Sequence, residues 1–150
     1  MKKLLTIILF VLCSLLSHSQ NNIVNLTQWN LNVFVEKCIK ELKIDSCIIV
    51  IQPINGLIYG KYQAVSYGSN KNYIIGISKS MYFEEALNAV AHELVHISQL
   101  SNNRLKILDS HHIIFDDKKY KVDEYTHIED VQEKEAIDIS KQLCSIIKIY

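Results

Sequence analysis

Two stretches of the chain carry apolar residues close to the spacing of one helix face. In residues 27–42 apolar side chains alternate with charged ones at this spacing, and Thr27 or Asn30 is the candidate N-cap. In residues 81–100 the pattern runs without a Gly or Pro to interrupt it, and Ser80 precedes it as an N-cap. The sequence therefore predicts helices over both stretches.

Between these stretches the pattern changes to short β-branched runs. Residues 46–52, SCIIVIQ, form an apolar run that ends at Pro53, which fits a buried strand better than a helix of that length. Residues 57–78 are rich in Ile, Tyr and Val and are divided by glycines. Turn signals such as Gly68-Ser69-Asn70 indicate two or three further strands, the last of them NYIIGIS.

The last third of the chain combines a polar, aromatic stretch with a final helix pattern. Residues 101–128 have no long periodicity, although HIIF and KYKV within them are candidate short strands. Residues 129–147 return to helical spacing. The whole pattern predicts an α+β protein with an N-terminal helix, a small mixed β-sheet, a central helix, an irregular linker and a C-terminal helix.

Composition narrows the classes of protein that this chain could be. Its 150 residues include one Pro and four Gly, and 49% are hydrophobic, which fits one compact domain rather than a disordered chain. The 16 basic side chains are matched by 16 acidic ones, so there is no positive surplus to neutralise phosphates. We therefore do not expect a nucleic acid as a partner.

The N-terminus has the parts of a secretory signal peptide. Lys2 and Lys3 precede an apolar run from Leu4 to Leu16, and small residues follow it. The run is shorter than the roughly 20 apolar residues that span a bilayer. We expect export to a periplasm or medium, cleavage after Ser19, one domain over residues 20–150 and no stable membrane association. The Lys-Lys start and Ser-Gln exit resemble a bacterial signal.

The chain has four cysteines, which are candidates for lipid attachment, disulfide bonds or metal binding. Cys13 lies in the apolar run, near where lipoproteins carry their lipid, but Leu12 before it is larger than the residue that lipoprotein peptidases prefer. We therefore do not expect a lipid anchor on Cys13. In the mature chain Cys38, Cys47 and Cys144 are odd in number, so at least one is unpaired or pairs between chains. None has C-x-x-C spacing, so a cysteine-rich zinc site is not indicated.

Within the second predicted helix, residues 92–96 are His-Glu-Leu-Val-His. Residues four apart on a helix lie one turn apart on the same side, so His92 and His96 project toward one point. Glu93 can reach a water on the same metal without ligating it, which suits a general base. A chain of this composition should contain only about 0.01 such motifs by chance. The pattern therefore indicates a metal clamp rather than two packed histidines.

A catalytic zinc site takes three protein ligands, so one more is needed. Position 102 is Asn, which excludes a third His six residues after His96. The final helix offers Glu133 and Glu135, on nearly opposite sides. The side of Glu133 continues into small and apolar residues that permit close helix packing, namely Ala136, Ile137, Ser140 and Cys144. We favour Glu133 as the third ligand, with Glu135 as the alternative.

These motifs resemble those of the gluzincin metallopeptidases, the clan of thermolysin-like enzymes with HExxH on one helix and a ligand Glu on the next. The HExxH match is full, and the order of elements is similar over residues 27–147. The resemblance implies a minimal zincin-like fold whose edge strand runs along the substrate, and NYIIGIS would be that strand. The small size also resembles short HExxH proteins of bacteria and phages.

The second motif is similar to the E-x-x-A pattern of that clan, at Glu133 and Ala136. The acidic or amide residue that often follows in the clan is Ile137 here, which keeps Glu135 open as the alternative ligand.

The resemblance implies metal-assisted hydrolysis of a peptide or protein substrate. Zn²⁺ on His92, His96 and Glu133 would lower the pKa of its water, and Glu93 would take the proton and pass it to the leaving amine. Tyr125 is our first candidate for stabilising the developing oxyanion.

Other polar residues are candidates for supporting roles. Three histidines share the irregular stretch with the oxyanion candidate, namely His111, His112 and His127. Gln99 lies on the same helix side as His92 and would orient a histidine or the substrate, and a solvated helix end is the equal alternative. The alternative function is a zinc-stabilised binding or assembly protein without turnover, and the intact Glu93 favours the enzyme.

Overall fold

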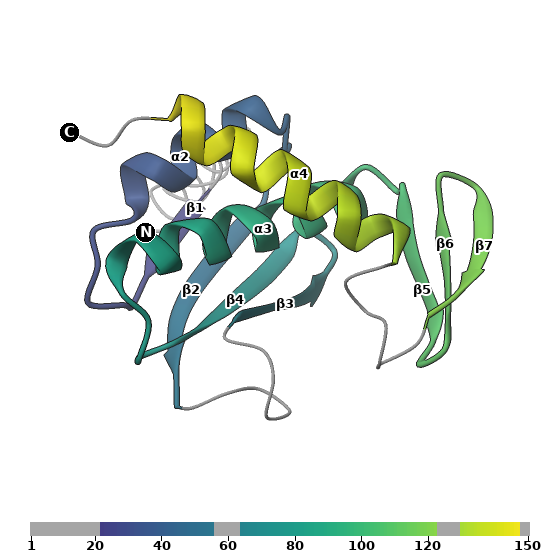
Figure 1. Cartoon of the computed structure of the whole chain (residues 1–150), viewed down its shortest axis with the longest axis horizontal. Coiled ribbons are helices and arrows are strands. Elements are labelled where there is room, and N and C mark those ends of the chain that lie inside the picture. The colour runs from purple at the N-terminus through teal and green to yellow at the C-terminus, as the bar shows by residue number, and fades with distance from the viewer. Residues whose placement is uncertain (1–21, 56–63, 123–129, 148–150) are drawn as a thin grey trace, which may run out of the picture.

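The computed structural model of the chain describes residues 22–55, 64–122 and 130–147 (Figure 1). The predicted signal peptide, residues 1–19, lies outside them. The described residues form three helices and two β-sheets, so the α+β class is confirmed. No helix in this part of the chain is long and apolar enough to cross a bilayer.

The larger sheet has four strands in the order β1-β2-β4-β3. Three of them are parallel, β1 (Asn22–Asn25), β2 (Ile48–Ile54) and β4 (Asn72–Ser78), and β3 (Ala64–Ser69) is antiparallel at one edge. Strand β4 is therefore an interior strand, paired with β2 on one side and β3 on the other. The expectation that NYIIGIS is the edge strand was wrong, because the β3–β4 hairpin places β3 there.

A tight turn explains the position of β3. Asn70 and Lys71 have φ angles of 51° and 67°, as a two-residue hairpin turn requires. Gly68, just before them, has a φ of 148°, and a Cβ at this position would overlap the carbonyl oxygen of Asn72. The turn lies slightly later than the sequence pattern indicated, and it folds β3 back along β4.

The helices lie on one face of this sheet. Helices α2 (Asn32–Glu41) and α3 (Phe83–Ser101) pack against each other and against the strands, and α4 (Val131–Ile146) packs on α3 (Figure 1). The isoleucines that point toward the helices are fully buried, namely Ile49, Ile51, Ile75 and Ile77. Three apolar side chains on the opposite face are between 42% and 49% exposed, namely Val24, Ile48 and Tyr67. The main core therefore lies between the sheet and α2 and α3.

Two features of the parallel strands were not predicted. Strand β1 was missed, because NIVN is short and half polar. Strand β2 does not stop at Pro53 but continues to Ile54. Alternate residues of a strand point the same way, and the carbonyl oxygen of Ile51 accepts from Leu26 N on the β1 side at 2.8 Å. The missing N–H of Pro53 therefore faces that side, where β1 has already ended at Asn25.

The predicted N-caps lie outside the helices that they were assigned to. Thr27 Oγ1 accepts from Trp29 N at 3.3 Å in a turn before α2, so neither Thr27 nor Asn30 caps that helix. Ser80 Oγ is hydrogen-bonded to Ser78 Oγ at 2.8 Å, and α3 begins three residues later than Ser80. The observed N-caps are Leu31 and Tyr82.

The stretch expected to be an irregular linker folds in part into an antiparallel meander. It consists of β5 (Leu105–Asp109), β6 (His112–Phe115) and β7 (Lys118–Lys121). HIIF is confirmed as β6 and KYKV overlaps β7, whereas β5 was not predicted. The meander has its own apolar cluster with the ends of α3 and α4, formed by Leu105, Ile113, Phe115, Leu100 and Val131. This cluster docks the meander beside the N-terminus of α4 (Figure 1).

The structure places none of Cys38, Cys47 and Cys144 in a disulfide. Burial raises the pKa of Cys38 to about 12 and that of Cys47 to about 11, and it also raises the pKa of Cys144. A protonated, buried thiol is a poor nucleophile. Cys38 and Cys47 belong to the main apolar core, and the partly buried Cys144 packs against it.

Candidate metal centre

Helix α4 approaches α3 along a face of small and buried residues. Ala136 is fully buried and Ser140 and Leu143 nearly so, each on the same side of α4 as Glu133. Small side chains let two helix backbones lie close together, which brings the first turn of α4 near the middle of α3. The helix-face argument from the sequence is thus consistent with the observed packing.

Three side chains meet where the two helices pack. His92 Nε2 lies 3.1 Å from Glu133 Oε2, and His96 Nε2 lies 3.2 Å from Glu133 Oε1. The two Nε2 atoms are 3.1 Å apart, and the imidazole rings are nearly perpendicular at 85°. The structure therefore brings together two residues of the HExxH motif and the favoured glutamate.

The spacing of these atoms fits a metal ion. Tetrahedral zinc with bonds of about 2.0–2.1 Å places its ligand atoms roughly 3.3–3.4 Å from one another. The two imidazole Nε2 atoms are 3.1 Å apart and each faces a different oxygen of Glu133, at 3.1 and 3.2 Å. With one ligand atom taken from each residue, the three atoms lie within 4.8 Å of one another. These three residues form the one group of three or more such side chains, within the described ranges, that could hold a metal ion.

Negative charge surrounds the buried end of this group. Burial by itself lowers the pKa of His96, but the hydrogen bond and charge of Glu133 raise it, and Glu93 and Gln99 add to the rise, to about 9. The field that favours a proton on His96 also favours a metal cation. The His92 side chain is 24% exposed, against 12% for His96 and 8% for Glu133, so the group opens to solvent on the side of His92.

Glu93 lies between the two histidines in the sequence and is buried, but it does not join the three-residue group. It is 7% exposed. Its charge nevertheless contributes to the raised pKa of His96, so the carboxylate is electrostatically close to the group.

Glu135, the alternative third ligand, is bound elsewhere. Its Oε2 accepts from Gln99 Nε2 at 2.8 Å, and its two oxygens accept from Arg104 at 3.0 and 3.2 Å. Glu135 therefore does not join His92 and His96. Gln99 Oε1 lies 2.9 Å from His96 Nδ1, so this side chain contacts one of the two histidines. Arg104 was missed, because no local pattern indicates which carboxylate a distant Arg will meet.

Of the four candidates for stabilising an oxyanion, two lie within the described residues and two lie outside them. Tyr125 and His127 lie outside the described residues. His111 and His112 lie at the β5–β6 turn, where His112 Nδ1 is 3.0 Å from Asp109 Oδ1. Neither His111 nor His112 belongs to the three-residue group.

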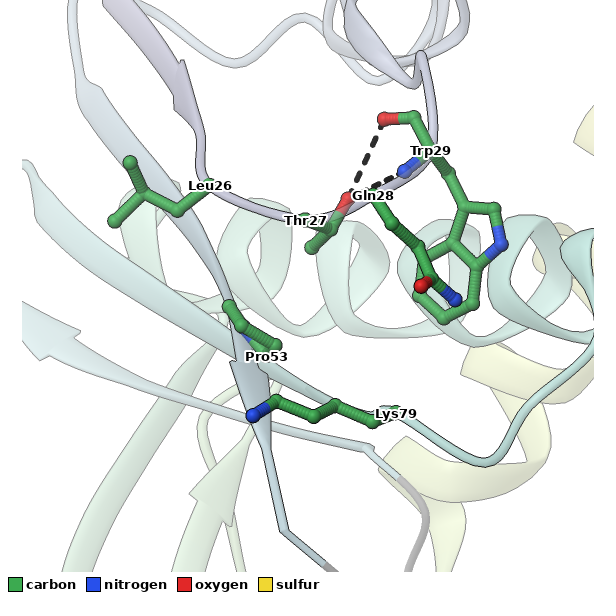
Figure 2. A pocket seen from close by; sticks show the side chains of 6 residues that line it. All are labelled: Leu26, Thr27, Gln28, Trp29, Pro53 and Lys79. Atoms are coloured by element: carbon green, nitrogen blue, oxygen red, sulfur yellow. Dashed lines mark hydrogen bonds between the residues drawn. The ribbon is translucent and has the colours of Figure 1, made fainter.

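A separate cavity of about 350 Å³ lies at the carboxyl ends of the parallel strands (Figure 2). It is lined by residues that follow β1, end β2 and follow β4, namely Leu26, Thr27, Gln28, Trp29, Pro53 and Lys79. No member of the metal group lines this cavity, and its side chains supply one amine but no imidazole, thiol or carboxylate. The sequence pattern did not indicate it.

No protein-family model matches this chain, and no curated protein and no solved structure was found to be similar to it. The site's chemistry therefore rests on its own residues.

Proposed function

We propose that this protein is an exported zinc metallopeptidase with a minimal zincin-like fold of the gluzincin type. The observation that carries the proposal is the convergence of His92, His96 and Glu133, with Glu93 buried beside them and outside the ligand group. Two imidazoles and one carboxylate are a ligand set that catalytic zinc uses. Export is proposed from the signal-like N-terminus.

The chain's own residues have distinct roles in this proposal. His92, His96 and Glu133 would hold Zn²⁺. When bound, zinc supplies Lewis-acid chemistry that polarises a carbonyl group and makes water more acidic. Glu93 takes the proton from the attacking water and passes it to the leaving amine, so its carboxylate must stay close to the metal and free of it.

Strand β3 is the proposed guide for the substrate. It is the antiparallel edge of the larger sheet and contacts α3, which carries the histidines. An edge strand presents backbone N–H and C=O groups to an extended peptide, which can pair with it as an additional strand. The substrate class would accordingly be a peptide or an extended protein segment.

The alternative function is a zinc-stabilised binding or assembly protein. One observation favours it, because the three candidate ligands come from two helices, so an ion would also tie α3 to α4. A purely structural ion does not need a non-ligating carboxylate beside it. Glu93 therefore separates the two functions.

The experiment compares wild type, Glu93→Gln and the matched control Glu84→Gln, which alters an exposed residue in the first turn of the same helix. Zinc content and melting temperature should be the same in all three. Cleavage of a mixed peptide library, followed by mass spectrometry, should fall by about 10²–10⁴-fold in Glu93→Gln only. Zinc-loaded wild type that cleaves nothing favours the binding protein, and unchanged cleavage by Glu93→Gln refutes the mechanism.

A further inference from the structure

The cavity at the carboxyl ends of the parallel strands arises because β1 ends before β2. Strand β1 ends at Asn25, opposite Ile51, whereas β2 continues past Pro53. The chain then leaves the sheet after Leu26, whose N still donates to Ile51 O at 2.8 Å. Strand pairing on this side therefore stops before Pro53, and residues 26–29 form the wall that faces it (Figure 2).

Side-chain hydrogen bonds hold this wall in one shape. Asn25 Oδ1 accepts from Thr27 N at 3.0 Å and from Thr27 Oγ1 at 2.7 Å, and Asn25 Nδ2 donates to Trp29 O at 2.7 Å. Trp29 N donates to Thr27 Oγ1 at 3.3 Å, and the Trp29 side chain packs against the main core. Bonds of this kind fix a turn without secondary structure. The cavity is therefore formed in advance of a ligand, as small-molecule sites usually are.

Lys79 supplies the one charged side chain of the cavity lining. Its backbone N donates to Ile54 O at 3.1 Å, which fixes the start of the side chain beside the end of β2. Figure 2 shows this side chain extended toward Pro53, with Trp29 on the other side of the cavity. Lys79 is exposed, and the ion pairs within the described residues do not include it. Its amine is therefore a cation at the cavity without a carboxylate partner from the described part of the chain.

We propose that this cavity binds a small carboxylate that carries an aromatic or branched apolar group. Its volume of about 350 Å³ lies in the range of small-molecule sites. In open sheets with parallel strands, ligands bind outside the carboxyl ends of the strands. The acid group pairs with the amine of Lys79, and the apolar group lies against Trp29 and Pro53. A phosphate fits less well, because the lining holds one cation and no helix N-terminus.

This inference goes beyond the proposed metallopeptidase activity and does not rest on it. None of His92, His96 and Glu133 lines the cavity, and the lining has no carboxylate, imidazole or thiol that could act as a general base or nucleophile. The cavity is accordingly a binding site and not a second catalytic centre.

The test uses Trp29, the single tryptophan of the chain, as a reporter inside the cavity lining. Its indole N–H gives one signal in a proton–nitrogen correlation spectrum, which is followed during titration with 3-phenylpropionate. Two matched probes are 3-phenylpropionamide, which lacks the charge, and acetate, which lacks the ring. The acid should shift the signal to saturation, and the amide should bind about tenfold more weakly, because a contact with a charged group is worth at least that factor.

Two variants test the role of the amine. Lys79→Met keeps the length of the side chain and removes its charge, so 3-phenylpropionate should bind about tenfold more weakly. Lys118→Met, a change of an exposed lysine in β7, is the matched control and should bind the acid as the wild type does.

Four results would overturn the proposal. The first is that 3-phenylpropionate causes no saturable shift of the Trp29 signal. The second is that the amide binds as tightly as the acid, and the third is that folded Lys79→Met binds the acid as tightly as the wild type. The fourth is that acetate binds as tightly as 3-phenylpropionate, since the apolar wall would then contribute nothing.

Discussion

Replacing Glu133 by Ala removes the member of the three-residue group that comes from α4. An ion that binds the native state stabilises it by RT ln(1 + [Zn]/Kd), which is about 4 kcal/mol when free zinc is 1,000 times Kd. For a domain of this size, 1 kcal/mol shifts the melting temperature by roughly 4 °C. Zinc at that concentration should therefore raise the melting temperature of the wild type by about 15 °C.

The structure gives the expected loss in the variant. Both oxygens of Glu133 contact a histidine Nε2, at 3.1 and 3.2 Å, so Ala removes the whole carboxylate from the group. Losing a residue that only supports a ligand costs about 10–100-fold in affinity, and losing the ligand should cost at least 100-fold. At the same zinc concentration at most about 1.4 kcal/mol remains, which is a shift of about 5 °C.

The assay is scanning calorimetry of each protein with and without zinc, together with the zinc content after loading. Each variant is compared with its own metal-free form, because Glu133→Ala also removes a hydrogen-bond partner from His92 and His96. Asp138→Ala, an exposed change on the same helix, should keep the full shift. A Glu133→Ala variant that keeps the wild-type shift refutes the assignment, and loss of the shift in Glu135→Ala alone would move the ligand to Glu135.

Two further predictions follow from the raised pKa values. Glu133 and Glu93 help raise the pKa of His96 from 6.5 to about 9, so its contribution to metal-free stability is complete below about pH 6.5 and is lost as the pH rises through about 9. Urea unfolding from pH 6 to 10 should show this loss in wild type relative to His96→Gln, and no difference in slope would contradict it. Burial raises the pKa of Cys38 and Cys47 to about 12 and 11, so at pH 8 an alkylating reagent should modify the less buried Cys144 first, as mass spectrometry of timed samples would show.

The sequence predicted best those features that depend on local periodicity. The HExxH helix and the final helix were recognised because their apolar residues repeat at the helical period. The strand predicted over residues 46–52 was recognised because it is a short, continuous β-branched run, and it is observed over Ile48–Ile54. Element ends were less well predicted, because side chains such as Thr27 and Ser80 bond within the preceding turn instead of capping a helix. Strands β1 and β5 were missed because they are short and partly polar. Their extended conformation depends on pairing with a neighbouring strand, which the local sequence does not show.

What the sequence determined by itself is the relation between His92, Glu93 and His96, because a helix sets the directions of residues one turn apart without help from the rest of the chain. The tertiary structure decided which carboxylate meets them. Glu133 and Glu135 differ by two positions, and only the packing of α4 on α3 turns one toward the histidines and the other toward Gln99 and Arg104. It also decided that β3 and not β4 lies at the sheet edge, since strand order arises from pairing between distant segments.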